Sequence, residues 1–162
     1  MSTANAIFKS YRAPRAVARS FRDAGADEAT GLGWLFAACI LFFVARLPAL
    51  ARTSHLSEGE VPLFGLALGT FFGTMLLAPI FFYVLASLSH LIARQFGGQG
   101  NVTDARLAMF WGLLASAPFV LFQGLVAALI GAGVQANLMA VLSFAVFLWV
   151  WINSLLELEG RG

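Results

Sequence analysis

Residues 31–50, GLGWLFAACILFFVARLPAL, are the stretch that decides the fold. Arg46 is the only charged residue among them. A helix of this length rises about 30 Å, which matches the hydrocarbon thickness of a bilayer. The stretch therefore predicts a membrane-spanning helix that ends at Pro48. It is also longer than the apolar region of a typical signal peptide, so we expect it to be retained.

Three more apolar runs follow, at about residues 62–92, 105–130 and 134–156. The run at 62–92 is longer than one crossing needs, but two crossings would take about 40 apolar residues and a turn. We therefore expect one long helix there, tilted or kinked at Pro79. The predicted fold is an all-α, polytopic transmembrane bundle of four spans over residues 31–157, with a polar tail at 158–162.

The composition agrees with a membrane protein. Of the 162 residues, 60% are hydrophobic and 11% are charged, whereas a soluble domain is about half apolar and one quarter charged. Cys39, the only cysteine, lies inside the first apolar run and reads as a core residue. His55 and His90 fall on opposite sides of the predicted bilayer, so we expect no shared ligand, no metal site and no cofactor.

Residues 1–30 form a basic arm. Half of the ten basic residues lie in it, namely Lys9, Arg12, Arg15, Arg19 and Arg22. On a helix, Ile7, Tyr11, Pro14, Ala18 and Phe21 share one side and the arginines share much of the other. This pattern predicts an amphipathic helix in the headgroup plane, firm from about Pro14, with the bilayer as its partner. A flexible basic tail is the alternative, and no nucleic-acid module accompanies the arm.

The distribution of charge predicts the orientation of the four spans. One side would carry eight Lys and Arg residues, the arm's five with Arg94, Arg106 and Arg161, and the other side only Arg46 and Arg52. All four tryptophans would lie in the half of the bilayer next to the eight basic residues. The positive-inside rule then places both termini in the cytoplasm, with the chain as a multi-pass protein of the inner (plasma) membrane.

Small residues recur every four positions on two spans. On the second span they are Gly65, Gly69 and Gly73, a glycine zipper, and on the third they are Ala108, Gly112 and Ser116. Such faces allow two helices to approach closely. They predict packing within the bundle, with self-association as the alternative.

Two prolines, Pro79 and Pro118, lie near the predicted bilayer centre. Each removes one helical hydrogen bond and so predicts a kink, although transporters also use broken helices at binding sites. Intramembrane charges are nearly absent, which argues against a proton pump or an ion-coupled carrier. No catalytic motif accompanies the spans. The possible surface cluster of His90, Arg94, Asp104 and Arg106 is explained by loop solvation, so we do not expect an enzyme.

The order of these features resembles the Ypt-interacting-protein (Yip) domain family, in a short bacterial-type form. A basic segment with an internal proline (residues 11–15, YRAPR) precedes the first span, and a Gly-rich connection (97–100, GGQG) leads into Ala105-Arg106 and a span with a central proline. A Trp-rich last span follows. The resemblance implies a small polytopic membrane protein. Eukaryotic relatives are linked to Rab-type GTPases and vesicle traffic. They carry a longer polar N-terminal region and usually five spans, and the Asp-Leu-Tyr-Gly-Pro element typical of them is missing here.

Together these features predict an integral membrane scaffold or accessory protein without chemistry of its own. Its expected partners are the bilayer and either other membrane proteins or further copies of itself. The alternative is a small transporter or channel, which would need a polar path past Gln123 and the two prolines.

Overall fold

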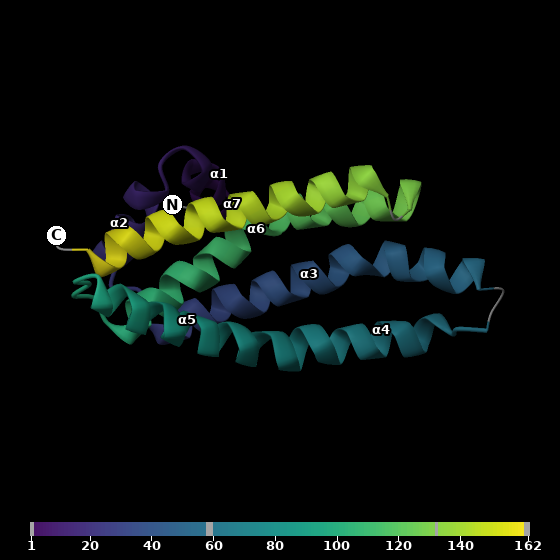
Figure 1. Cartoon of the computed structure of the whole chain (residues 1–162), viewed down its shortest axis with the longest axis horizontal. Helices are drawn as coiled ribbons and strands as arrows, with labels where there is room; N and C mark the ends of the chain where they lie inside the picture. Colours follow the sequence, from purple (N-terminus) through teal and green to yellow (C-terminus); the bar gives the residue numbers. More distant parts are fainter. Residues whose placement is uncertain (1, 58–59, 132, 161–162) are drawn as a thin grey trace.

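The structure is a computed structural model that describes residues 2–57, 60–131 and 133–160, and every regular element in these ranges is helical (Figure 1). In chain order the elements are α1 (Thr3–Arg12), α2 (Pro14–Asp23), α3 (Glu28–Leu56), α4 (Leu63–Phe72), the π-helical turn η1 (Gly73–Leu77), α5 (Ala78–Gln95), α6 (Val102–Ile130) and α7 (Val134–Glu159). The segment α4–η1–α5 is continuous, so the described residues hold four helices long and apolar enough to cross a membrane. The protein is an all-α integral membrane protein.

Helix α6 is the centre of the bundle and packs along both α3 and α7. The α4–η1–α5 helix runs along α3 at the edge of the bundle, and its α5 part also packs against α6 (Figure 1). The short helices α1 and α2 lie against α6 and α7 near the end where α3 begins and α7 ends. We call this end, which also carries both chain termini, the terminal end of the bundle.

Two glycines of α6 set the distances between the central helices. A Cβ atom at Gly112 would lie 3.0 Å from Cβ of Trp151 in α7. A Cβ atom at Gly124 would overlap the carbonyl oxygen of Ala45 in α3. Because backbone atoms cannot move aside as a side-chain tip can, α3 and α6 approach this closely only because residue 124 has no side chain.

The second apolar run forms one long helix, as expected, and its irregularity lies just before Pro79. Proline at residue 79 offers no N–H to the carbonyl one turn earlier and crowds it with its ring. The backbone widens there into the π-helical turn η1, and regular helix resumes at Ala78. Pro118, in contrast, lies inside α6, which continues to Ile130.

The first span does not end at Pro48, and this prediction was wrong. Helix α3 passes through Pro48 and ends at Leu56. A proline inside a membrane helix costs one hydrogen bond but leaves the following turns intact when neighbouring groups compensate. At the other end of the chain, α7 extends through Glu159 and buries both Leu158 and Glu159, so these two residues belong to the packed helix and not to a polar tail.

The arm forms two helices that break at Ala13, where Pro14 starts α2. Their apolar side faces the bundle, with Val17 and Ala18 buried. Phe21 packs its ring against Trp34 and Trp111, with both pairs of ring centroids 4.6 Å apart. The arm is therefore part of the packed structure and not a flexible tail.

Candidate functional site

Three groups of polar side chains lie toward the terminal end of the bundle. The first group joins α3, α5 and α6 through Glu28, whose carboxylate accepts hydrogen bonds from Tyr83 and, at 2.7 Å, from Nη1 of Arg106. The guanidinium of Arg106 also lies 4.0 Å from the centre of the Tyr83 ring. A cation over an aromatic face adds to the ion pair. This group ties the starts of α3 and α6 to the middle of α5.

The second group joins the arm to the end of α7. Arg19 Nε pairs with Glu157 Oε1 at 2.8 Å, and Arg15 Nε donates to Asn153 Oδ1 at 3.1 Å. Arg22 Nη2 donates to the carbonyl oxygens of Glu157 and Leu158 at 2.7 and 2.6 Å. The last carbonyls of a helix lack helical partners and carry partial negative charge, so a guanidinium there is favourable.

Hydrogen bonds within the packed interior also fix the arm. Trp111 Nε1 donates to Ser10 Oγ at 2.9 Å, and the Tyr11 hydroxyl donates to the carbonyl oxygen of Ala115 at 2.8 Å. Burial raises the pKa of Tyr11, which keeps its hydroxyl protonated and able to donate. The arm is thus bound by apolar packing, by hydrogen bonds and by ion pairs at once.

The third group is a buried pair between α5 and α7. His90 Nδ1 lies 2.6 Å from Glu159 Oε1, and the two residues are only 5% and 3% exposed. Among the described residues, the other carboxylate oxygen, Oε2, has no hydrogen-bond partner. A Cβ atom at Gly98 or Gly100 would come within 3.1 or 3.0 Å of Oε2, so the connection between α5 and α6 fits over the carboxylate because these positions are glycine.

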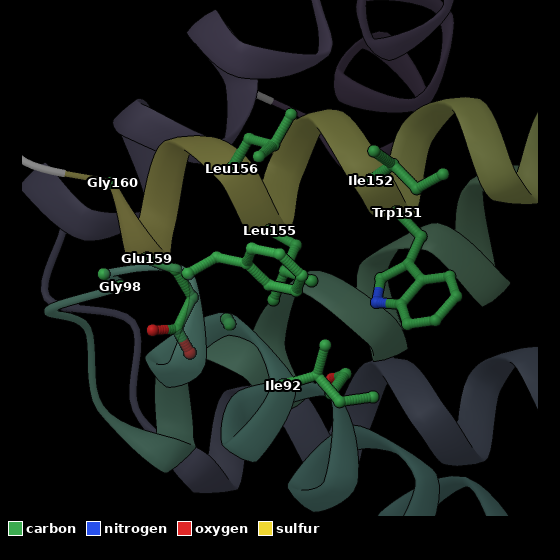
Figure 2. Close-up of a pocket in the computed structure, with 12 residues that line it drawn as sticks. Ile92, Gly98, Trp151, Ile152, Leu155, Leu156, Glu159 and Gly160 are labelled. Carbon is green, nitrogen blue, oxygen red and sulfur yellow. The ribbon is translucent and has the colours of Figure 1, made fainter.

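Beside this pair lies a pocket of about 420 Å³ between α5, α7 and the segment that follows α5 (Figure 2). Glu159 stands at one end and Trp151 at the other, with apolar side chains between them, including Ile92, Ile152, Leu155 and Leu156. Trp151 Nε1 is buried and, within the described part of the chain, also lacks a partner. The pocket is therefore lined mainly by apolar side chains, and the unpaired polar atoms of Glu159 and Trp151 are themselves buried.

Comparison with known families decides the classification, because the Yip1 domain model matches residues 8–160, nearly the whole chain. The chain belongs to the Yip1 domain family. No curated protein and no solved structure matches it significantly.

Two stripes of small residues were predicted in this Yip1 domain, and the structure places them in opposite surroundings. On α6, Ala108, Gly112 and Ser116 are buried, with Gly112 against α7. On the other stripe, a Cβ atom at Gly69 or Gly73 would meet nothing within 4 Å, and one at Gly65 would meet only Pro62, at 3.8 Å. The zipper face of the Yip1 domain therefore points away from the rest of the chain.

The predicted basic residues of the Yip1 domain also divide into two sets. Arg15, Arg19 and Arg22 contact α7, whereas Lys9 and Arg12 lie on the exposed surface of α1. All five side chains are exposed, but three of them are already held against α7. Within the ranges that the structure describes, no three His, Cys, Asp or Glu side chains are grouped so that they could hold a metal ion.

Sequence reasoning missed the strongest polar contacts of the Yip1 domain. Glu159 was assigned to a polar tail and His90 to a solvated surface cluster, yet they form a buried pair. Glu28 was assigned to the arm, yet it starts α3 and binds Arg106. Two acidic residues at the borders of apolar runs were the available signal, because charges at such positions need partners.

Proposed function

We propose that this Yip1 domain protein is a scaffold or accessory protein of the inner (plasma) membrane that acts through contacts with lipid and other membrane proteins. The observation that carries the proposal is the outward face of α4. Only 6% of the most apolar stretch of Leu63–Gln95 is buried within the chain, compared with 22–28% for the other three spans. The open glycines at 69 and 73 make this face suitable for close approach by another helix.

In this proposal both termini are cytoplasmic. The eight basic residues assigned to that side belong to the arm, to the end of the second span, to the start of the third span and to the C-terminus. Arg46 and Arg52 lie in the later part of α3, toward the other end. Reporter fusions at residues 1 and 162 should report the cytoplasm, and a fusion after residue 57 should report the opposite side.

The exposed basic residues of α1 provide contact with anionic headgroups, each contributing about 1 kcal/mol near the surface. Deleting the arm would also uncover Trp111 and α7, so a charge exchange is the cleaner test. The double substitution Lys9→Glu and Arg12→Glu should weaken salt-sensitive binding to anionic vesicles while leaving the fold intact. Equal binding by the wild-type and exchanged proteins would contradict this role.

The assembly role is tested by cysteine cross-linking in native membranes. Cys39 is buried, so a Cys39→Ala background permits single cysteines elsewhere. Gly69→Cys should form specific cross-links, either to a second copy or to a neighbouring membrane protein. Val141→Cys serves as the control, because Val141 is 66% exposed on α7 and carries no stripe of small residues nearby. Cross-linking at residue 69 no stronger than at residue 141 would contradict the proposal.

A transporter lacks comparable support. Gln123 lines a second pocket, of about 390 Å³, with Arg52 and Asn137 near the end opposite to the termini. This pocket shares no lining residue with the pocket beside Glu159. Between the two ends, Phe110, Trp111 and Leu114 are buried in the core of the bundle.

A further inference from the structure

The pocket at the end of the bundle opposite to the termini has the properties of an anion site (Figure 1). Its volume of about 390 Å³ falls in the common range of small-molecule sites, about 300–1,000 Å³. Leu56 and Ala127 form part of its wall, and its polar groups include Arg52, Gln123 and Asn137. Among the described residues that line it, Arg52 is the only charged one. We call it the Arg52 pocket.

The guanidinium of Arg52 is held in place by the end of α6. Nη1 donates to the carbonyl oxygen of Ala128 at 3.2 Å. A Cβ atom at Gly131 would lie 3.0, 3.1 and 3.1 Å from Nη1, Cζ and Nη2, and these nearly equal distances place the glycine over a flat face of the guanidinium. A guanidinium has five N–H groups and is always ionised in proteins. The other four N–H groups have no partner among the described residues, so Arg52 retains donors for a ligand.

The amides of Gln123 and Asn137 complement this cation. Neither side-chain amide forms a hydrogen bond with a described residue, and each can both donate and accept. Asn137 is exposed, and Arg52 and Gln123 are half-buried, so a ligand can reach all three from the surface. A guanidinium matches the oxygens of a phosphate through parallel N–H groups, and the amides match hydroxyl groups. The pocket therefore fits a phosphate that carries a hydroxylated substituent.

The level of the pocket along the helices indicates where such a phosphate would come from. Arg52 is four residues before the end of α3 at Leu56, and Gln123 is seven residues before the end of α6 at Ile130, or about 6 and 10 Å from these ends. Each helix has 29 residues, whereas about 20 cross the hydrocarbon, so the helix ends reach the headgroup region. Leu56 is 67% exposed beside the pocket and offers an apolar contact to an acyl chain. Lipid phosphates are therefore within reach of Arg52.

We propose that the Arg52 pocket binds an anionic phospholipid with a glycerol headgroup, whose phosphate accepts from Arg52 and whose hydroxyl groups bond to the amides of Gln123 and Asn137. A choline headgroup fits less well for two reasons. Its trimethylammonium is repelled by Arg52, and it has no hydrogen-bonding group for the amides. The orientation proposed above places this lipid in the outer leaflet, but the contact itself does not depend on that orientation.

The experiment first weakens the lipid contact of the arm. Every protein tested carries Lys9→Glu and Arg12→Glu, so the result does not depend on the role proposed for these two residues. Full-length protein is incubated with vesicles holding equal amounts of glycerol and choline phospholipids with identical acyl chains, then extracted in mild detergent and measured by native mass spectrometry. The protein with Arg52 intact should retain the glycerol lipid about tenfold over the choline lipid. Equal retention of the two lipids would overturn the proposal.

Arg52→Gln should reduce this preference to about one. Arg46→Gln is the matched control, because Arg46 is an exposed cation six residues earlier on the same helix and does not line the pocket. It should preserve the preference, and equal losses in the two variants would overturn the proposal by showing that only the charge of this end matters.

The variant Thr53→Phe tests the same site should Arg52→Gln fail to fold. Thr53 is exposed and lines the pocket, so a ring at this position would fill it while keeping Arg52. Selective retention should then be lost, and an unchanged preference would contradict the site. Inorganic phosphate should not displace the bound lipid. Displacement at equal concentration would show that a soluble oxyanion, not a lipid, is recognised.

Discussion

Helices α4 and α6 carry small residues at the same four-residue spacing, but the chain uses them in opposite ways. On α6, Gly112 of the stripe lies against Trp151 of α7, and Gly124, outside the stripe, lies against the backbone of Ala45 in α3. On α4 the glycines face away from the rest of the chain. The spacing indicates that a face permits close approach, but it does not indicate whether the approaching helix belongs to the same molecule. Substitutions that add side chains to the two faces should separate these cases.

The largest effect is expected from Gly124→Leu. Its Cβ alone would overlap the Ala45 carbonyl, and overpacking by even a few atoms commonly costs 1–3 kcal/mol, so we expect a loss of at least about 3 kcal/mol or failure to fold. Gly69→Leu is the matched change on α4 and should fold normally while weakening association with other chains. Unfolding in detergent and cross-linking in membranes measure the two outcomes. Equal losses of stability would show that the two faces do not differ.

A second large effect should follow His90→Ala, which tests how α5 is held to α7. Removing one partner of this buried hydrogen-bonded pair leaves the other side chain unpaired, which costs about 1–3 kcal/mol. We expect a loss near the upper value of this range, measured by thermal unfolding. His55→Ala is the control, because His55 is exposed and its change should stay within about 0.5 kcal/mol. A similar small change for His90→Ala would mean that the pair contributes little.

A smaller but opposite pair of effects should distinguish Gly112→Ala from Gly69→Ala. The added methyl at residue 112 would lie 3.0 Å from Trp151 Cβ, so α7 must shift, at a cost of about 1 kcal/mol. At residue 69 the methyl meets nothing within 4 Å, and the higher helix propensity of alanine should add up to about 1 kcal/mol. Melting temperatures that move in the same direction would contradict the comparison.

The smallest effect concerns how the helices start. The N-cap residue of α3 is Asp27, whose carboxylate accepts hydrogen bonds from the backbone N–H and the hydroxyl of Thr30. The N-cap residue of α4 is Pro62, which makes no side-chain cap hydrogen bond. The hydrogen bonds from Thr30 lower the pKa of Asp27. Because the pKa of Asp27 is lower in the folded than in the unfolded protein, its ionised carboxylate stabilises the fold at pH values above the unfolded pKa. This stabilisation is lost as the pH falls through the pKa of the folded protein. Asp27→Ala should therefore melt below wild type at neutral pH, and the difference should shrink in acid. A difference that does not depend on pH would contradict this.

Hydrophobic runs predicted most of the fold, because a bilayer leaves few solutions for long apolar segments. The four spans, the single long helix at 63–95 and the irregularity at Pro79 all follow from run length and from the chemistry of proline. The site was harder to predict. Glu28 with Arg106, and His90 with Glu159, are 78 and 69 residues apart, and only the packing of the helices brings each pair together.

Local sequence patterns also failed as predictors where the same pattern is compatible with two different structures. Gly124 was not singled out because it belongs to no stripe, yet it makes a closer approach than any predicted glycine. The spacing of the arginines in the arm predicts one basic side of a helix. It does not show whether that side contacts lipid headgroups or the end of another helix. Arg22 meets the carbonyls of α7 because α2 and α7 end side by side.

That contact also affects the order in which the molecule can be completed. The arm leaves the ribosome before the four spans, whereas the carbonyls that Arg22 binds belong to α7, the last of the described spans. Until α7 has been synthesised and inserted, the arm therefore lacks part of the surface against which it packs. Its closure over Trp111 and the end of α7 would be the step that finishes assembly, after the last span has entered the membrane.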